Sequence, residues 1–180
     1  MGNVIHIFGA SGSGTTTLGK KICKELGYTH MDTDDYYWMP TDPKFIQKRP
    51  VEERVRLMKH DIERFENVVI SGSLTDWGDI LIPYFTLAIR IEIDQSIRIE
   101  RLRQRERARF GARIEPGGDM YRQHAEFIEW AKTYDSGDLN HRSRRKHDEW
   151  QKLLTCTLLR IDGAEALETN FQKIYPYVQK

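Results

Sequence analysis

The sequence predicts an α/β fold in which a parallel sheet is covered by helices on both faces. Short apolar segments, such as residues 4–8 and 68–70, alternate with longer segments in which apolar residues recur every three or four positions. Strands that alternate with helices pair in parallel through right-handed crossovers. Ligands of such sheets bind beyond the carboxyl ends of the strands, so the residues that follow each strand form the candidate site.

The expected elements follow one another along the whole chain. Strands are expected at residues 4–8, 28–31, 68–70, 87–93 and 158–161. Helices are expected at 15–26, at 51–65, from a cap at Ser96 to about 110, at 120–134, and from 164 onward. Residues 111–118 interrupt the pattern, and 135–145 form a polar, basic segment. Since no repeat or linker is found, residues 1–180 are expected to form a single domain.

The composition excludes several classes of protein. The 180 residues carry 28 Lys and Arg against 27 Asp and Glu, so the net charge of +1 does not indicate a nucleic-acid partner. Cys23 and Cys156 form no pair with metal-ligand spacing, which argues against a zinc site or a disulfide scaffold. No long apolar segment or export signal is found, so we expect a cytoplasmic protein without a membrane span. The oligomeric state is not indicated.

Residues 9–16 have the spacing of a phosphate-binding Walker A loop between a strand and a helix. Such a loop turns successive backbone N–H groups toward a polyphosphate at the positive end of the helix dipole. Thr16 stands where the loop hydroxyl meets Mg²⁺. The alternative is a glycine-rich turn that binds no ligand. The predicted nucleotide-binding residues of this segment are Gly9, Ser11, Gly12, Ser13, Gly14, Thr15, Thr16 and Thr17.

Thr15 occupies the position of the lysine that normally reaches the β- and γ-phosphates. A threonine hydroxyl supplies a hydrogen bond but no positive charge. The charge that stabilises phosphoryl transfer must therefore come from elsewhere in the chain.

With this loop, the chain resembles the P-loop small-molecule and nucleoside-monophosphate kinases, a group that includes adenylate, cytidylate, shikimate and gluconate kinases. Some cytidylate-kinase-like members have a similar loop without the lysine. The resemblance implies a three-layer P-loop NTPase sandwich with a five-stranded parallel sheet of order 2-3-1-4-5 and a lid insertion at about residues 105–120. It also implies ATP and Mg²⁺ as cofactors.

Carboxylates follow the second expected strand. In an extended segment Asp32 and Asp34 project to the same side, where they can hold Mg²⁺ and accept a proton from a hydroxyl. The segment is similar to a shikimate-kinase motif, which implies that Asp32 serves the metal and that Asp34 is the catalytic residue on the acceptor side. The alternative is that these aspartates cap a following turn or helix.

An arginine-rich helix is the candidate lid. Between residues 98 and 113 the chain has seven arginines and two glutamates, a local charge of +5. Arg101, Arg105 and Arg109 recur every four residues and share one face. The segment is similar to the start of the lid in adenylate-kinase-like enzymes, which implies that Arg101 stacks on adenine and that Arg105 and Arg109 act catalytically on the phosphates. A solvated helix face or a nucleic-acid patch are the alternatives.

Four other features are weaker candidates. Aromatic residues at 36–38 can line an acceptor site or simply belong to the core, and Gly72 can allow a close approach to an acceptor. Arg49 and Arg54 are candidate anion ligands or plain surface charges. The basic cluster at 142–145 can reach an acceptor phosphate or lie on the surface.

The function predicted from these features is transfer of the γ-phosphate of ATP to a small acceptor, with Mg²⁺. A nucleoside monophosphate is the first acceptor class, as in an adenylate-kinase-like enzyme. The second is a hydroxylated metabolite, as in shikimate or gluconate kinases. Non-catalytic nucleotide or nucleic-acid binding and simple NTP hydrolysis remain as alternatives.

Overall fold

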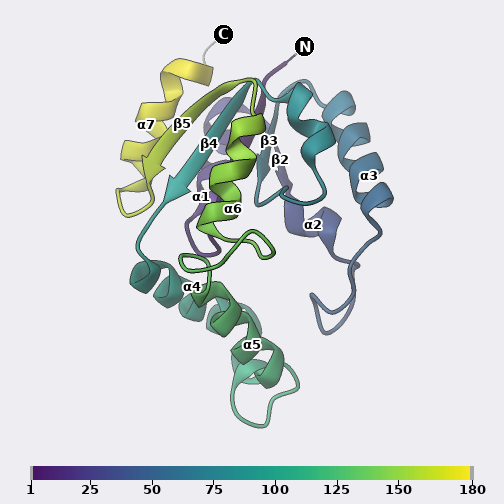
Figure 1. Cartoon of the computed structure of the whole chain (residues 1–180), viewed down its shortest axis with the longest axis vertical. Helices are drawn as coiled ribbons and strands as arrows, with labels where there is room; N and C mark the ends of the chain where they lie inside the picture. The colour runs from purple at the N-terminus through teal and green to yellow at the C-terminus, as the bar shows by residue number, and fades with distance from the viewer. Residues whose placement is uncertain (1, 179–180) are drawn as a thin grey trace.

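The computed structural model describes residues 2–178 and contains a five-stranded, all-parallel sheet (Figure 1). Its strands are β1 (Val4–Gly9), β2 (Thr29–Asp32), β3 (Val68–Ser71), β4 (Leu87–Glu92) and β5 (Thr157–Asp162). They lie in the order β2-β3-β1-β4-β5, which confirms the predicted order. In the central strand, Ile5 pairs with Val69 on one side and with Leu87 on the other.

Helices cover both faces of the sheet, as predicted. Helices α1 (Thr15–Leu26) and α7 (Leu167–Val178) cover one face, where Ile22 and Ile174 pack against the strand residue Ile7. The other face is covered by α3 (Val51–Arg64), by the 3-10 helix η1 (Asp79–Tyr84) and by α6 (Arg144–Trp150) with its short extension η3 (Gln151–Leu153). There Phe8 and Trp150 belong to one core. The three-layer α/β class is thereby confirmed.

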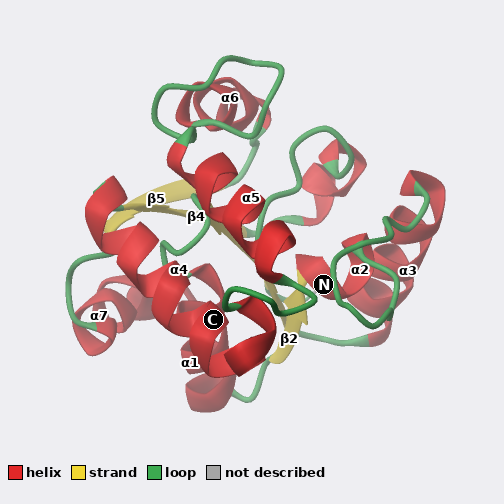
Figure 2. Ribbon diagram, turned by 90° about the horizontal axis from the view of Figure 1, so that it is seen from below, coloured by secondary structure: helices red, strands yellow, loops and turns green. Residues whose placement is uncertain are grey.

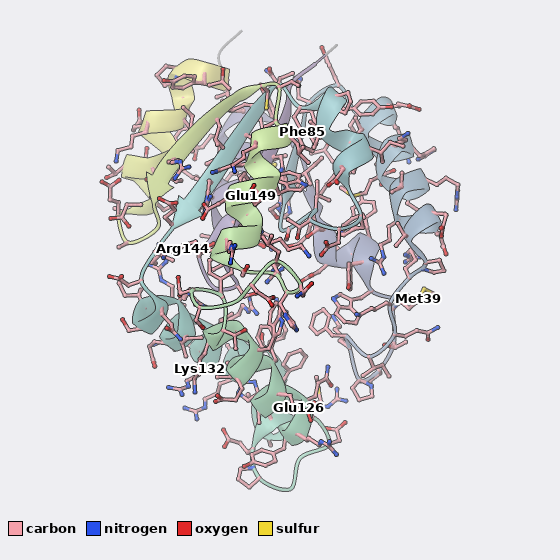
Figure 3. The ribbon with its side chains drawn as sticks, viewed as in Figure 1. Met39, Phe85, Glu126, Lys132, Arg144 and Glu149 are labelled. Carbon is pink, nitrogen blue, oxygen red and sulfur yellow. The ribbon has the colours of Figure 1, made fainter. Side chains whose placement is uncertain are left out.

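The arginine-rich segment forms a separate layer beyond the carboxyl ends of the strands (Figures 1 and 2). It consists of α4 (Gln95–Phe110), the 3-10 helix η2 (Gly111–Ile114) and α5 (Tyr121–Lys132). Leu102 and Ile128 are buried in a small core between α4 and α5. Figure 3 shows Arg144 at the end of α6 that faces this layer, with Lys132 and Glu126 on α5. We call residues 95–132 the lid.

Several expected elements differ from the structure. Asp34 does not lie in an extended segment, because a short helix α2 (Thr33–Tyr37) begins directly after β2. The cap position of α4 is Asp94, and Ser96 lies inside the helix. The polar segment 135–145 is not entirely irregular, because its last two residues begin helix α6. The cap residue of that helix, Ser143, accepts a hydrogen bond from the backbone N–H of Lys146. Short helices of this kind carry too few apolar repeats to be seen in the sequence.

Helix α7 begins at Leu167, three residues later than predicted. A turn precedes it, in which the Asp162 carboxylate accepts a hydrogen bond from the backbone N–H of Ala164. No helix within residues 2–178 combines the length and the apolar character that crossing a membrane requires.

Candidate functional site

The loop between β1 and α1 has the shape that phosphate binding requires. Gly12 and Gly14 have φ angles of 82° and 103°, in the left-handed region that favours glycine. A Cβ atom at Gly12 would lie 2.4 Å from the carbonyl oxygen of Arg98, so the lid helix sits directly on the loop. Helix α1 begins at Thr15, and the N–H groups of its first turn are available to an anion.

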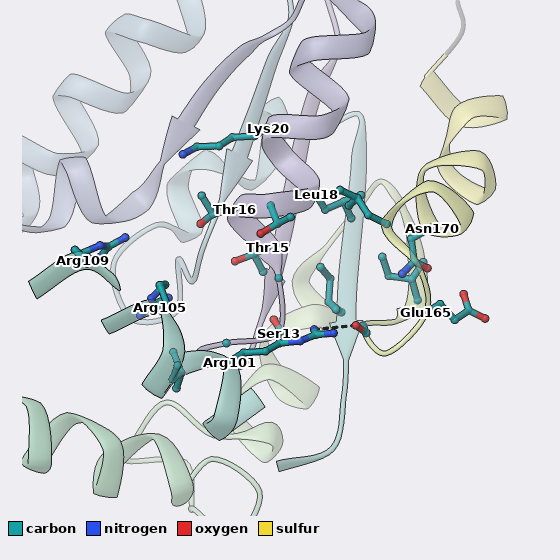
Figure 4. A pocket seen from close by; sticks show the side chains of 18 residues that line it. Ser13, Thr15, Thr16, Leu18, Lys20, Arg101, Arg105, Arg109, Glu165 and Asn170 are labelled. Carbon is teal, nitrogen blue, oxygen red and sulfur yellow. Dashed lines mark hydrogen bonds between the residues drawn. The ribbon is translucent and has the colours of Figure 1, made fainter. Parts of the chain in front are cut away.

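Two cavities meet at this loop. The first, of about 510 Å³, lies between the loop, the lid helix α4 and the segment between β5 and α7 (Figure 4). The second, of about 560 Å³, lies over the ends of β2 and β3. Five residues line both cavities: Gly12, Thr15, Thr16, Arg105 and Arg109. A group that is bound in one cavity can therefore contact a group bound in the other at this junction.

Most of the predicted nucleotide-binding residues line the first cavity, and three of them, Gly12, Thr15 and Thr16, line both. The first is lined by Gly12, Ser13, Gly14, Thr15, Thr16, Thr17 and Arg101. Gly9 and Ser11 line the second. The loop as a whole thus forms the boundary between the two cavities.

The two predicted aspartates are brought together, although by a turn and not by an extended strand. Asp32 caps α2 by accepting a hydrogen bond from the backbone N–H of Asp34 over 3.1 Å. Its other carboxylate oxygen accepts a hydrogen bond from the Thr16 hydroxyl over 2.9 Å. The alternative, in which Asp32 caps a following helix, is therefore confirmed, while its role toward a metal stays a prediction.

Asp34 opens into the second cavity, where water can reach it but the cavity walls displace much of its hydration. This loss of hydration raises the pKa of the Asp34 carboxyl, and the neighbouring charge of Asp32 raises it further. Arg142, Arg105 and Arg109 oppose the shift. A carboxylate with a raised pKa that faces a cavity is suited to accept a proton from a hydroxyl.

Thr16 and Asp32 are the residues that fit a magnesium ion. A hydroxyl and a carboxylate that already lie within hydrogen-bond distance offer two oxygen ligands on one side of the junction. Mg²⁺ is usually held by one or two such groups together with water and substrate phosphates. Bound there, the ion would neutralise phosphate charge.

The lid arginines divide into structural and cavity-lining groups. Arg98 is fully buried and donates hydrogen bonds to the carbonyl of Ala131 (2.5 Å) and to Asp135 (2.6 Å), so it fixes α4 to the end of α5. Arg101, Arg105 and Arg109 line the first cavity on the side opposite Thr15 and Thr16 (Figure 4).

The three cavity-lining arginines differ in their contacts. Arg101 donates a hydrogen bond to the carbonyl of Gly163 over 2.9 Å. Arg105 forms an ion pair of 2.8 Å with the buried carboxylate of Glu106. The Arg109 guanidinium lies 6.0 Å from the centre of the Phe45 ring.

The lid also contacts the segment 39–49, which we call the flap. Arg113 of the lid forms a 2.8 Å ion pair with Asp42 of the flap. The Gln123 side chain donates a hydrogen bond to the carbonyl of Lys44 over 2.8 Å. The lid and the flap together cover the second cavity.

Several residues of the second cavity were not predicted from the sequence. Phe127 and Trp130 of α5 line this cavity, together with Tyr37, Trp38 and Phe45 from a different part of the chain. Trp130 lies three positions after Phe127, and this helical spacing was the only signal in the sequence. Lys20, one turn after Thr16 on α1, lines the first cavity and was also missed.

The loop after β3 carries the Ser73 hydroxyl, which hydrogen bonds to a buried histidine. Ser73 lines the second cavity and hydrogen bonds to Nε2 of His147 over 3.1 Å, and Tyr134 bonds to Nδ1 of the same ring over 2.8 Å. Burial holds the pKa of His147 well below its ordinary value. Gly72 has φ 118°, and a Cβ atom there would lie 1.9 Å from the Thr33 hydroxyl oxygen, so the loop requires glycine.

The weaker arginine candidates have other roles. Arg54 is buried with its guanidinium 3.8 Å from the centre of the Tyr37 ring, and it donates a hydrogen bond to the carbonyl of Arg49. Arg49 forms an ion pair of 2.7 Å with Glu53. Both arginines therefore support the wall that carries Tyr37.

Comparison with known proteins agrees with the resemblance seen in the sequence. No family model matches the chain. Over 174 residues it is 41% identical to the uncharacterized protein YqaC of Bacillus subtilis, covering 97% of this chain and 96% of that protein. It is 29% identical to a cytidylate kinase of Pyrococcus horikoshii over 113 residues, 57% of each chain, and 38% identical to a probable gluconokinase of Xenopus tropicalis over 53 residues, 29% of this chain and 28% of that protein.

Solved structures show the same architecture. A shikimate kinase from Acinetobacter baumannii matches with a TM-score of 0.56 at 13% identity, over 99% of this chain and 93% of that chain. A gluconokinase from Sinorhizobium meliloti matches with a TM-score of 0.51 at 15% identity, over 98% and 91%. At these identities the likeness bears on the fold, which is that of the P-loop kinases.

Proposed function

Because the chain belongs to one family with YqaC of Bacillus subtilis and has the fold of the P-loop kinases, we propose that it transfers the γ-phosphate of ATP to a small acceptor. The observation that carries this proposal is the junction of the two cavities. Thr15, Thr16, Arg105 and Arg109 line both, so ATP in the first cavity would present its γ-phosphate to an acceptor in the second.

The nucleotide is assigned to the first cavity. Backbone N–H groups of residues 9–16 bind its phosphates, and the residue that lies beside the base is Arg101, which already contacts the loop after β5 through Gly163. Thr16 and Asp32 hold Mg²⁺, which shields the phosphate charge. Arg105 and Arg109 stabilise the charge of the transferred group from the lid.

The acceptor is assigned to the second cavity. Its oxygen forms a bond to the γ-phosphorus while the bond to the bridging oxygen breaks, and ADP leaves with that electron pair. When the acceptor is a hydroxyl, its proton passes to Asp34. The contacts between lid and flap, such as Arg113 with Asp42, keep water from taking the place of the acceptor.

Two acceptor classes are supported by different observations. The aromatic side chains of Trp38, Phe45 and Phe127 line the second cavity and suit the base of a nucleoside monophosphate. The Asp34 carboxylate beside the junction suits a hydroxylated metabolite, since a phosphate acceptor is already ionised and needs no base.

A screen of acceptors tests the proposal. The chain is incubated with MgATP and with nucleoside monophosphates, sugars and hydroxy acids, and the release of ADP is measured. We expect one class to accelerate release well above the rate without acceptor. A product with two linked phosphates identifies the first class, and a phosphate monoester identifies the second. Tight ATP binding with no acceleration by any compound would instead favour a nucleotide-binding protein.

A further inference from the structure

The loop lacks the positive charge that a lysine at position 15 would supply, and Arg142 has a charge without an evident partner. Arg142 lies 127 positions after Thr15, in the segment between α5 and α6. Its guanidinium nevertheless donates a hydrogen bond to the hydroxyl of Ser11, within the loop itself. The side chain also lines the second cavity, as Ser11 does.

The surroundings of Arg142 are built to hold a guanidinium in one place. Its charge lies 4.7 Å from the centre of the Trp130 ring, which favours a cation over the ring face. Nε is buried and has no hydrogen-bond partner within the described residues. Burial lowers the pKa of Arg142, and Asp34 is the first of the charges that counteract this. The group remains charged because an arginine does not lose its proton in a protein.

Two of the three buried arginines are compensated by carboxylates, and the third, Arg54, lies over the Tyr37 ring away from the junction of the cavities. Arg90 pairs with Asp148 at 2.6 Å, and Arg98 pairs with Asp135 at 2.6 Å. Within residues 2–178, no carboxylate lies within ion-pair distance of Arg142. A cation that has lost much of its hydration and has no anionic partner is costly. Such a cost is offset when an anion binds beside it.

We propose that Arg142 supplies the positive charge of the missing loop lysine and binds the transferred γ-phosphoryl group at the junction of the two cavities. This inference rests on the proposed function. It assigns to one residue the charge that the loop sequence Gly14-Thr15-Thr16 lacks, and it explains why Arg142 touches the loop.

Three other cations near the junction are less suited to this role. Arg105 is already paired with the buried Glu106, so much of its charge is compensated. Arg109 belongs to the lid and lies near Phe45 of the flap. Lys20 is exposed, and solvent screens an exposed charge strongly. Of these cations, Arg142 is the one with a direct hydrogen bond to the loop.

The first experiment compares MgATP and MgADP binding by calorimetry in the wild type and in Arg142→Gln. A cation that binds the γ-phosphoryl group contributes to MgATP binding and not to MgADP binding. We expect Arg142→Gln to weaken MgATP about 10-fold to 100-fold, as for the loss of a charged hydrogen bond, and to change MgADP by less than about 2-fold. Arg145→Gln, an exposed arginine of the same cluster, is the matched control and leaves both affinities unchanged.

The second experiment returns the lysine to the loop. Thr15 lines both cavities, so a longer side chain there reaches the junction. In the double variant Thr15→Lys/Arg142→Gln we expect the preference for MgATP over MgADP to recover by about 10-fold relative to Arg142→Gln. Arg142→Lys, which keeps a charge but loses the planar fork, is expected to lie between wild type and Arg142→Gln. It also serves if Arg142→Gln unfolds at the assay temperature.

The outcomes separate this inference from the proposed function. Equal weakening of MgATP and MgADP binding in Arg142→Gln would overturn the inference. An unchanged MgATP affinity would overturn it too, and if the KM for the acceptor rose at the same time, Arg142 would be a ligand of the acceptor. Failure of Thr15→Lys to restore the preference would also contradict it. If the wild type binds neither nucleotide, the proposed function itself fails, and the inference fails with it.

Discussion

Thr16 donates a hydrogen bond from its hydroxyl to the Asp32 carboxylate over 2.9 Å, which connects the first turn of α1 to the end of β2. Both side chains are thereby oriented before any ligand binds. An Mg²⁺ ion that takes these two oxygen ligands needs little rearrangement of the chain. The hydrogen bond between Thr16 and Asp32 therefore predicts an effect on magnesium-dependent ATP binding, which can be measured without knowing the acceptor.

Thr16→Val, which keeps the shape of the side chain and removes the hydroxyl, should weaken the dependence of ATP binding on magnesium. We expect MgATP affinity to fall by about tenfold, as for the loss of a ligand to a charged group, while ATP affinity without magnesium changes little. Calorimetry with and without MgCl₂ measures both. An equal loss in the two conditions would mean that Thr16 acts on the phosphates and not on the metal.

Asp34→Asn should lower turnover with a hydroxyl acceptor by about 10²-fold to 10⁴-fold, the usual contribution of a general base. The ionised form is the active one, so turnover of the wild type rises with pH through the pKa of Asp34. That pKa is raised by loss of hydration, so the midpoint lies above 3.8, the ordinary value.

The pH profile provides the check on this role. In Asp34→Asn the acidic limb should disappear, whereas Asp35→Asn, an exposed neighbour, should retain it. A phosphate acceptor would give a much smaller loss in Asp34→Asn. The size of the loss therefore also reports on the acceptor class.

The elements that carry local patterns could be predicted from the sequence. The spacing of Leu18, Ile22 and Leu26 defines α1, and the loop before it is recognisable from its glycines. The helical repeat of Arg101, Arg105 and Arg109 places all three on one wall, as the structure has them. What these residues do remains a prediction.

The features that depend on tertiary packing could not be predicted. Arg98 and Arg101 are three positions apart on one helix, yet one is buried against Asp135 and the other lines a cavity. Arg142 reaches Ser11 across 131 positions, and no periodicity reports such a contact. His147 is buried and hydrogen bonds to Tyr134, although it follows a polar, basic segment of the sequence that gives no sign of burial.

Phe45 of the flap should control how well the lid keeps water from the junction. It has a positive φ of 66°, a conformation that neighbouring contacts must hold, and its ring centre lies 6.4 Å from that of Phe110 on the lid. Phe45→Ala removes a contact of about 0.5–1.5 kcal/mol between the flap and the lid. The ratio of molecules with lid and flap in contact to molecules with the two apart should therefore fall by about 2-fold to 10-fold.

We expect Phe45→Ala to raise ATP hydrolysis without acceptor relative to transfer to an acceptor. ADP release in the presence and absence of acceptor measures this ratio. Phe45→Leu keeps most of the apolar contact and should resemble the wild type. An unchanged ratio in Phe45→Ala would show that the flap does not exclude water.

Arg98→Ala should destabilise the fold, whereas Arg103→Ala on the same helix should not. Arg98 is fully buried, so its removal leaves the buried carbonyl of Ala131 without that donor and leaves Asp135 with Arg144 alone as its cationic partner. Leaving a buried acceptor without its donor costs about 1–3 kcal/mol of the free energy of unfolding. Arg103 is exposed, and its substitution should change that free energy by less than about 0.5 kcal/mol. Urea denaturation of both variants measures the difference, and equal midpoints would contradict the structural role of Arg98.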